Sequence, residues 1–309
     1  MKKPELVVTP HSLSEIIPMI EAGADSFILG EDRFALRLAG NFKLPDLKEA
    51  VSIIKAHGKK SYVAINAILM NDAVEGLKTY LGLLDGLGID ALRFSDPGAY
   101  LIAKETVPHI PLHWSSETLG TNYFTANYWL ERGISRVVLA PEIIKEAVLE
   151  TKSAATGEIE VLVHGAVSMF HSRRKLIGNY MEFQDSALTL ESPDGYTLFD
   201  TERDLHYPIY EDPQGTHIFN GSDVCMIDDL DVMIDEGIDA FRIDGILKSR
   251  SYRIDTTAAY RLAIDLAIAD RERYQKVGRA LYKKMEGIQP SGRNIDRGFY
   301  YKPSIYKHS

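Results

Sequence analysis

Cysteine is almost absent from this chain of 309 residues, and Cys225 is its only representative. A single thiol excludes an intrachain disulfide bond, and no Cys-x-x-Cys pair is present to suggest a structural zinc site. Proteins without disulfides are typical of reducing compartments. We therefore expect a cytoplasmic protein.

Long apolar runs are absent as well. The chain begins MKKPELVV, in which the apolar run is too short for the core of a signal peptide. No stretch approaches the roughly 20 apolar residues of a membrane-spanning helix, so we expect no membrane association. A Gly-x-Ser-x-Gly elbow, a phosphate-binding Walker loop and a dinucleotide fingerprint are also missing, which leaves serine-triad chemistry without local support.

The net charge of -9 does not favour nucleic-acid binding by the chain as a whole. The segment 271–309 is an exception, because it is rich in lysine, arginine and tyrosine. Charge steering combined with aromatic stacking would suit RNA. The candidates for RNA contact are Lys283, Lys284, Arg293 and Arg297. The alternative is a C-terminal helix with a solvated face, followed by a tail that packs on the rest of the protein.

One local pattern recurs along the chain: an amphipathic stretch, a glycine, and a short apolar run. The glycines Gly23, Gly88, Gly133 and Gly237 fit helix C-caps, and the runs after them fit strands buried on both faces. The predicted strands lie near 5–9, 25–30, 60–66, 90–95, 110–115, 135–140, 159–164 and 239–244. Regular alternation of strands and helices predicts a parallel sheet, and eight strands favour a closed (β/α)8 barrel. A doubly wound open sheet is the alternative.

The alternation stops between residues 165 and 238. We expect an insertion at about 180–222 in the seventh strand-to-helix loop, projecting from the rim where barrel active sites lie. It is predicted to hold a hairpin over Ala187–Asp200, turning at Asp194-Gly195, and a second over His206–Asn220, turning near Gln214-Gly215. Helices are expected at 223–236 and 250–285. The domains are then a barrel over 1–270 and a basic, aromatic extension over 271–309.

Polar side chains stand at or just beyond the predicted strand ends, where a barrel forms its pocket. Together they could bind a small anion or transfer protons. The catalytic candidates are His164, Glu117 and Asp244; the substrate-binding candidates are Glu31, Arg33, Asn66, Asp96, His113, Glu142 and Arg174. Any one of them could instead be a helix cap or an exposed loop residue.

Metal and thiol chemistry have little support. His164 and His171 lack the i, i+4 spacing of a helical zinc pair. Cys225 stands where a helix is predicted to begin, which could lower its pKa. A buried structural cysteine is the interpretation that we favour.

The segment 163–176, VHGAVSMFHSRRKL, resembles the signature of the collagenase-like peptidase family, which is classed among the peptidases of unknown catalytic type. Matches elsewhere cover most of the chain. They are AGAD at 22–25 with Leu29-Gly30, DVCMI at 223–227, IDG at 243–245 with Lys248-Ser249, and Asn294 with RGF at 297–299.

The resemblance implies more than peptide hydrolysis. Several members of the family belong to systems that hydroxylate tRNA wobble uridine, ribosomal RNA or ubiquinone precursors, and the RNA systems depend on prephenate. Typical members of that branch hold an iron–sulfur cluster through four cysteines. Here Ser168 and Lys175 stand at the first two of those positions, and only Cys225 remains. Asp244 and Ile246 replace a family glutamate and arginine.

The departures make this chain similar to the smaller of two paralogs that form 5-hydroxyuridine at the tRNA wobble position. The resemblance then implies that this chain binds no cluster and that a larger, cysteine-bearing paralog carries it. Prephenate is the expected co-substrate, and tRNA the expected partner. Lys175 adds positive charge where a cluster would lie, so it joins the substrate-binding candidates. The alternatives are a peptidase and a non-catalytic scaffold for the paralog.

Overall fold

Eight parallel strands form a closed barrel in the computed structural model, which describes residues 2–185, 196–202 and 204–302. They are β1 (Glu5–Val8), β2 (Ser26–Gly30), β3 (Lys60–Ile65), β4 (Ala91–Phe94), β5 (Leu112–Trp114), β6 (Arg136–Val138), β7 (Glu158–Ser172) and β11 (Ala240–Ile243). Strand β11 pairs with β1 on one side and with β7 on the other. The predicted barrel is thereby confirmed, and the open sheet was the wrong alternative.

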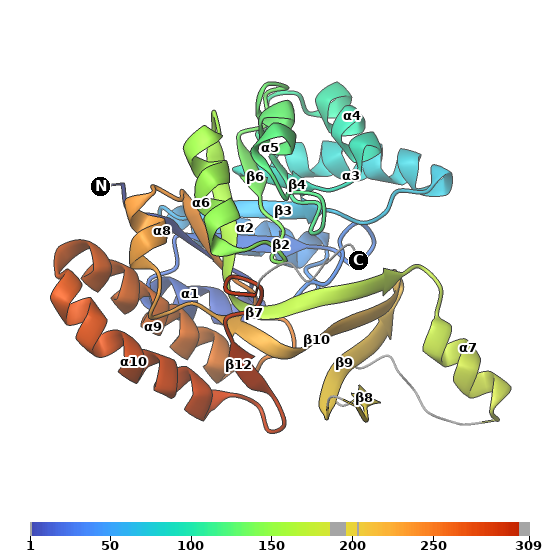
Figure 1. Cartoon of the computed structure of the whole chain (residues 1–309). Helices are drawn as coiled ribbons and strands as arrows, with labels where there is room; N and C mark the ends of the chain where they lie inside the picture. The colour runs from blue at the N-terminus through green and yellow to red at the C-terminus, as the bar shows by residue number, and fades with distance from the viewer. Residues whose placement is uncertain (1, 186–195, 203, 303–309) are drawn as a thin grey trace.

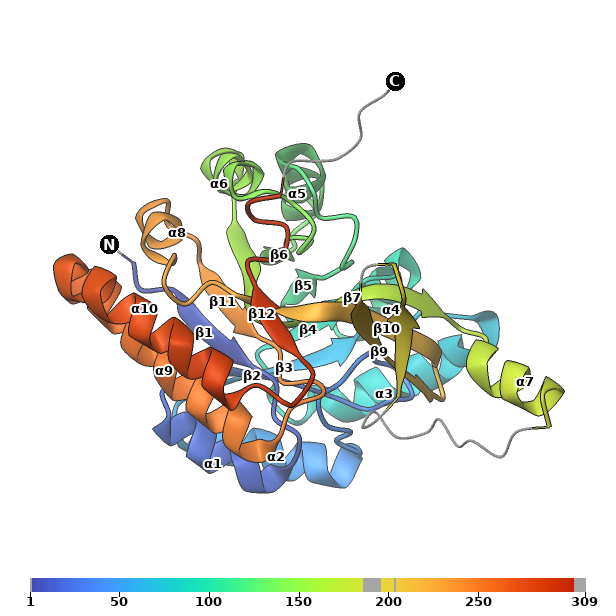
Figure 2. The same cartoon turned by 60° about the horizontal axis from the view of Figure 1, so that its bottom comes forward.

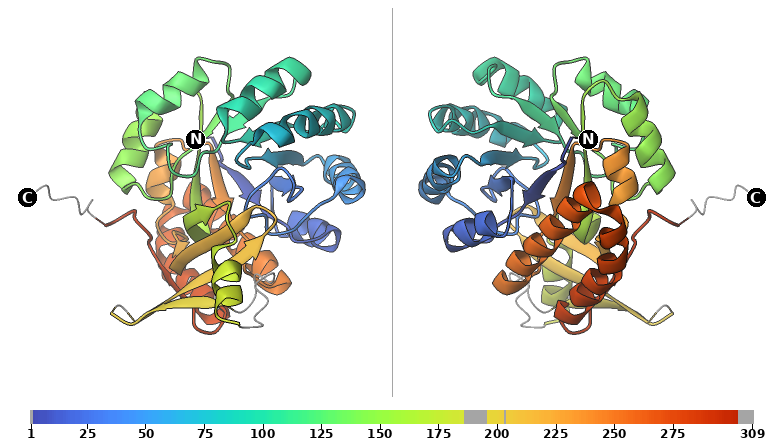
Figure 3. Two further views of the ribbon diagram at one scale, coloured as in Figure 1. Left: turned by 90° about the vertical axis from the view of Figure 1, so that its right-hand side faces the viewer. Right: turned by 90° about the vertical axis from the view of Figure 1, so that its left-hand side faces the viewer.

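Helices surround the strands (Figures 1 and 3). They are α1 (Leu13–Glu21), α2 (Leu44–Ala56), α3 (Val74–Asp85) after a short 3-10 turn (Asn71–Ala73), α4 (Pro97–Thr106), α5 (Tyr123–Leu130), α6 (Lys145–Ala154), α8 (Asp231–Asp235) and α9 (Arg250–Ala269). Their apolar faces cover the outward side chains of the strands and form the main core with them. The four recurrent glycines all adopt positive φ, between +70° and +100°, as the C-cap prediction requires.

The barrel interior is more polar than its outer wall. Small apolar side chains such as Val7, Ala64 and Ala240 form one inner cluster. Between them the strands point arginines and glutamates inward, among them Arg93 and Glu160, which are both buried. The interior therefore contains charged groups whose partners must also lie inside it.

Strand β7 is the link between the barrel and the insertion. Its first half pairs with β6 and β11, and its second half pairs antiparallel with β10 (Gly215–Cys225). The chain between these strands forms α7 (Leu176–Phe183), β8 (Thr197–Asp200) and β9 (Leu205–Asp212). Figures 1 and 2 show α7 at the far end of β7, away from the barrel.

The second predicted hairpin is confirmed, because β9 pairs with β10 around a turn between Asp212 and Gly215. Most of the first one, over Ala187–Asp200 with its turn at Asp194-Gly195, lies outside the described residues. Its described end is β8, which pairs with β9.

Two helix predictions need correction. The helix expected over 223–236 is reduced to α8, because β10 continues to Cys225 between β7 and β12 (Asn294–Asp296). The helix expected over 250–285 is two helices, α9 and α10 (Arg271–Ile288). The helical conformation is interrupted at Asp270, whose side chain accepts a hydrogen bond from the Arg273 backbone N–H and caps α10.

The segment from 271 onward contacts the barrel through α10, β12 and the side chain of Tyr300. Helix α10 packs against α9. The Tyr274 hydroxyl donates a hydrogen bond to the Ile227 carbonyl and accepts one from the Leu230 backbone N–H. Strand β12 pairs with β10, and the Tyr300 hydroxyl donates to the Leu162 carbonyl of β7 at 2.6 Å. Residues 303–309 lie outside the described part of the chain. Across the described residues, no helix combines the length and apolar character needed to cross a bilayer.

Candidate functional site

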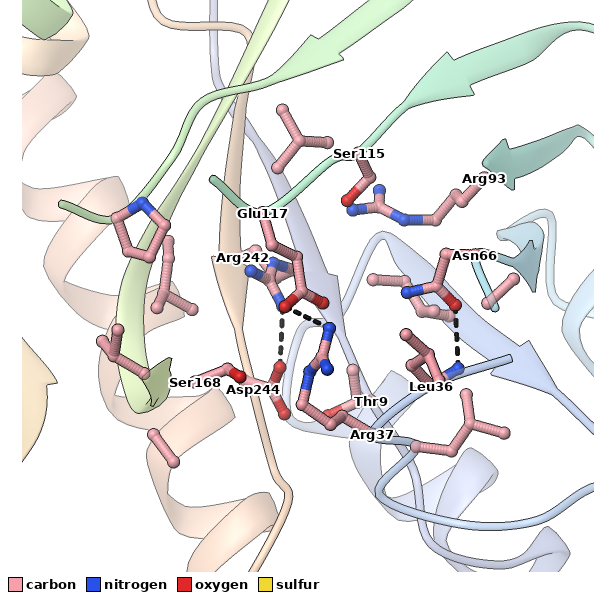
Figure 4. A pocket seen from close by; sticks show the side chains of 18 of the residues that line it. Thr9, Leu36, Arg37, Asn66, Arg93, Ser115, Glu117, Ser168, Arg242 and Asp244 are labelled. Carbon is pink, nitrogen blue, oxygen red and sulfur yellow. Dashed lines mark hydrogen bonds and ion pairs between the residues drawn. The ribbon is translucent and has the colours of Figure 1, made fainter. Parts of the chain in front are cut away.

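A cavity opens at the carboxyl ends of the barrel strands, the end at which barrel enzymes bind their substrates. Figure 4 shows its polar lining. The polar residues are Thr9, Arg37, Asn66, Arg93, Ser115, Glu117, Ser168, Arg242 and Asp244. An outer cavity of about 310 Å³ shares Arg37, Asn66, Ser115, Glu117 and Ser168 with it and extends to Phe170 and His171 on β7.

The floor of the cavity is a buried network of ion pairs. Glu160 accepts two hydrogen bonds from Arg93, both of 2.8 Å, and lies 3.5 Å from Arg136 and 3.6 Å from Arg242. Burial alone would raise the pKa of Glu160, but these arginines overcome it and lower the pKa. The carboxylate is therefore ionised, and it holds three guanidinium groups in place beneath the cavity.

Arg37 and Glu117 form an ion pair at the boundary between the deep and the outer cavity. Burial opposes the charge on both groups. Their mutual attraction nevertheless raises the pKa of Arg37 and lowers that of Glu117. Both residues have positive φ, +52° and +64°. Non-glycine residues rarely adopt this conformation, and such strain is concentrated at functional sites.

Asp244 is the one cavity carboxylate whose pKa is raised. Burial is the main cause, and Arg242, whose Nη1 lies 2.7 Å from Asp244 Oδ2, offsets it only in part. The Arg242 Nε atom is buried and has no hydrogen-bond partner within the described structure. The pair therefore offers a carboxyl group able to hold a proton beside an incompletely bonded arginine.

Gly165 explains the close contact of β7 with Asp244. It has φ +119°, and a side chain there would collide with the backbone carbonyl of Asp244. Only glycine allows β7 and the end of β11 to approach so closely. The glycine of the HG pair in the 163–176 segment thus shapes this wall of the cavity.

His164 does not face the cavity. Its ring lies between two tyrosines of α9, with Nε2 2.6 Å from the Tyr252 hydroxyl and Nδ1 3.2 Å from the Tyr260 hydroxyl. Burial lowers its pKa to about 3, so it is neutral. The pairing of β7 with β11 shifts by one residue between Leu162 and His164, which turns the side chain outward.

The structure brings together only some of the other predicted residues. Glu117, Asp244 and Asn66 line the cavity, and Asn66 fixes the loop after β2 by accepting a hydrogen bond from the Leu36 N–H. His113 lies deeper in the barrel against Tyr62, and burial together with Arg136 lowers its pKa strongly. The remaining members do not line it. Asp96 caps α4, Glu142 is exposed in a turn, Glu31 is half-buried, Arg33 lies over Phe34, and Arg174 and Lys175 are exposed beyond β7.

Two of the four proposed RNA-contact residues form ion pairs with aspartates of the same chain. Arg293 forms an ion pair with buried Asp223. Arg297 pairs with Asp228, donates to the Cys225 carbonyl at 2.8 Å, and lies over the Tyr282 ring. Of the candidate set, Lys283 and Lys284 are the exposed members on α10.

The residues that sequence reasoning missed are Arg37, Arg93 and Arg242. Arg93 and Arg242 interrupt the apolar strands ALRF and AFRI, at positions that alternate with outward-facing residues. An arginine in a strand buried on both faces indicates a charged barrel interior. Arg37 carried no such signal, because it lies in a loop.

Cys225 is at the end of a strand and not at the start of a helix, so the alternative in which a helix start lowers its pKa is wrong. Burial raises the pKa of the thiol to about 11. The favoured interpretation as a buried structural cysteine is confirmed.

The donor set does not fit an iron–sulfur cluster, since such clusters are held by several thiolates and the chain supplies one thiol. Within the described ranges, no three His, Cys, Asp or Glu side chains are arranged to hold a metal ion.

The fold and the cavity define a (β/α)8-barrel protein with an arginine-rich pocket at its carboxyl-terminal rim. The chain belongs to peptidase family U32, which it matches over residues 11–309. It is 48% identical to tRNA hydroxylation protein P2 of Bacillus subtilis (strain 168), over 99% of this chain and 100% of that protein. It is 29% identical to tRNA hydroxylation protein P1 of the same organism, over 88% of this chain and 66% of that longer protein.

Among solved structures, the U32 peptidase Mk0906 superposes with a TM-score of 0.50 at 12% identity. The match covers 78% of this chain and 92% of that one. At this identity the likeness supports the barrel fold alone.

Proposed function

We propose that this chain is a subunit of a tRNA-modification system that forms 5-hydroxyuridine at the wobble position and depends on prephenate. The observation that carries the proposal is the 48% identity to tRNA hydroxylation protein P2, which extends over 99% of the chain. An identity of this extent includes the barrel, the rim insertion and the C-terminal segment.

The proposed partner is a larger paralog that carries the iron–sulfur cluster. The P1 and P2 proteins occur together in Bacillus subtilis, and P1 is the longer of the two. The chain described here has a single, buried thiol. Any step that needs a thiolate-bound cluster must then take place on another chain.

Prephenate is a dicarboxylate, and arginine is the side chain best suited to bind carboxylates in pairs of hydrogen bonds. Arg37, Arg93 and Arg242 surround the deep cavity. One carboxylate of the ligand would take the place of Glu117 beside Arg37, and the second would approach Arg242. The protein supplies binding and orientation in this proposal, and Asp244 can hold or release a proton near the ligand.

Peptide hydrolysis is the weaker alternative. A serine peptidase needs a hydroxyl that is hydrogen-bonded to a base. In the described structure, no serine of the cavity is hydrogen-bonded to a histidine. His164 is turned away, and His171 contacts the Gln214 carbonyl instead.

Mass spectrometry of tRNA nucleosides from a strain that lacks this chain tests the proposal. We expect wobble 5-hydroxyuridine to fall and to return when the wild-type chain is supplied. Glu117→Gln and Arg242→Met chains that melt like the wild type are expected not to restore it. An unchanged level in the deletion strain would contradict a role in modification.

Activity of the purified paralog alone decides the role of this chain within the system. We expect the paralog to require it. Full activity of the paralog without this chain, together with co-purification of the two, would identify a scaffold.

A further inference from the structure

We propose that the rim insertion binds single-stranded RNA, through the basic segment Arg173–Lys175 and the exposed aromatic face of α7. The inference rests on the proposed function, because it assigns the surface by which a tRNA would reach the cavity. It moves the expected RNA contact from the C-terminal segment to the end of β7.

Strand β7 connects the cavity to this surface without a break. Ser168 lines the deep cavity, and Met169, Phe170 and His171 line the outer one. Strand geometry places Ser172 about 13 Å beyond Ser168. A base held at the outer cavity would therefore leave its flanking nucleotides beside the segment that follows Ser172.

The helix α7 exposes an apolar face that the described structure does not cover. Leu176, Tyr180 and Phe183 are spaced i, i+4 and i+7 and so share one side of the helix. Phe183 is 82% exposed, Tyr180 57%, and no residue of α7 is buried. In Figures 1 and 2 this helix stands apart from the barrel at the end of β7. Exposed aromatic rings in such a position are platforms on which bases stack.

The orientation of α7 is fixed by a buried carboxylate. Glu211 of β9 accepts hydrogen bonds from the Ile177 and Gly178 backbone N–H groups at 2.9 and 3.1 Å. Glu211 is itself buried and bonded to Thr216 of β10. The aromatic face is thus held in place before any ligand binds, which reduces the entropy lost on binding.

Three consecutive cations precede α7 and favour a nucleic-acid ligand at that end of the surface, while the acidic Glu182 and Asp185 lie at the other end of the helix. Arg173, Arg174 and Lys175 are consecutive exposed cations in a chain of net charge -9. Arg173 donates to the Ile68 carbonyl at the edge of the outer cavity. Arg174 has no ion pair with a described side chain. Glu182, the acidic residue of α7, lies more than a quarter turn away from the aromatic face.

The test is binding of a synthetic, unmodified anticodon stem-loop RNA by the full chain, measured at several salt concentrations. Phe183→Ala is expected to weaken binding by about 5- to 150-fold, the range for loss of one stacked base. Arg174→Ala is expected to weaken it and to reduce the slope of log K against log salt by about 0.7, the value for one phosphate contact on a single strand.

Matched controls separate this surface from the rest of the chain. Phe124→Ala removes an aromatic ring of similar exposure on α5, and Lys283→Ala with Lys284→Ala removes two exposed cations from α10. We expect both control variants to bind RNA like the wild type. Undiminished binding by the Phe183 and Arg174 variants, or no binding by the wild type, would overturn the inference. The inference would also be overturned if Phe183→Ala no longer co-purified with the paralog but still bound RNA, because the aromatic face of α7 would then be a protein-binding surface. Each of these results leaves the deletion-strain test of the proposed function standing on its own.

Discussion

The carboxylate of Glu160 is expected to be the most costly single group to remove from the barrel interior. Its side chain is fully buried and forms ion pairs with Arg93, Arg136 and Arg242. Glu160→Ala would leave the buried guanidinium group of Arg93 without the carboxylate to which it donates two hydrogen bonds, a change that typically costs about 3–5 kcal/mol. For a chain of 309 residues, the entropy of unfolding is about 0.65 kcal/mol per kelvin, so the melting temperature should fall by about 5–8 °C.

Glu158→Ala is the matched control. Glu158 lies two residues earlier on the same strand and pairs with Arg136 at 2.8 Å, but its side chain is 38% exposed. A partly exposed pair contributes about 1 kcal/mol or less, and Arg136 keeps Glu5 as a partner. Thermal melting and urea unfolding of both variants give the comparison. Equal destabilisation of the two variants would refute the reasoning, because burial of Glu160 would then have no special weight.

Three further predictions concern single groups. The pKa of Asp244 is raised in the folded chain, so its protonation favours folding at acid pH, and this contribution is lost as the pH rises through the folded pKa. The stability of Asp244→Asn relative to the wild type, measured from urea midpoints, should therefore increase between pH 4 and 8. A difference that does not change with pH would contradict this. The pKa of His164 is lowered to about 3, so the wild type should lose stability as the pH falls below about 6.5, and His164→Gln should show a flatter profile over the same range. Cys225, with its pKa raised to about 11, should resist iodoacetamide in the native chain and react once the chain is unfolded in urea, and rapid native labelling would show that the thiol is accessible.

The barrel could be predicted because each of its strands is buried on both faces and therefore appears in the sequence as a short apolar run. The glycines before four of these runs adopt the positive φ that the pattern required. The boundaries of seven strands agree with this contrast to within two residues, whereas β7, expected over 159–164, continues to Ser172 because it pairs with β10. Packing against the surrounding helices keeps the outward side chains of the strands apolar, so the signal is strong.

The site was predicted less well because small departures from regular geometry decide it. Strict alternation along β7 would place His164 inside the barrel with Glu160, but the shift in pairing with β11 turns it toward α9. Arg293 and Arg297 look available in the sequence because their partners, Asp223 and Asp228, lie about 70 residues away. Arg37 acquires its role only when the loop after β2 folds over the cavity.

The sharing of β7 between the barrel and the insertion limits how the protein can vary in length. Residues 164–172 of β7 are hydrogen-bonded to β10, and residues 158–164 complete the barrel wall. A deletion that begins before Ser172 would remove a pairing on which the wall beside the cavity depends. Length changes between β7 and β9 should therefore be tolerated best beyond Arg173, whose side chain donates to the Ile68 carbonyl of the loop after β3, because the chain from there to β9 takes no part in the pairing of the barrel strands.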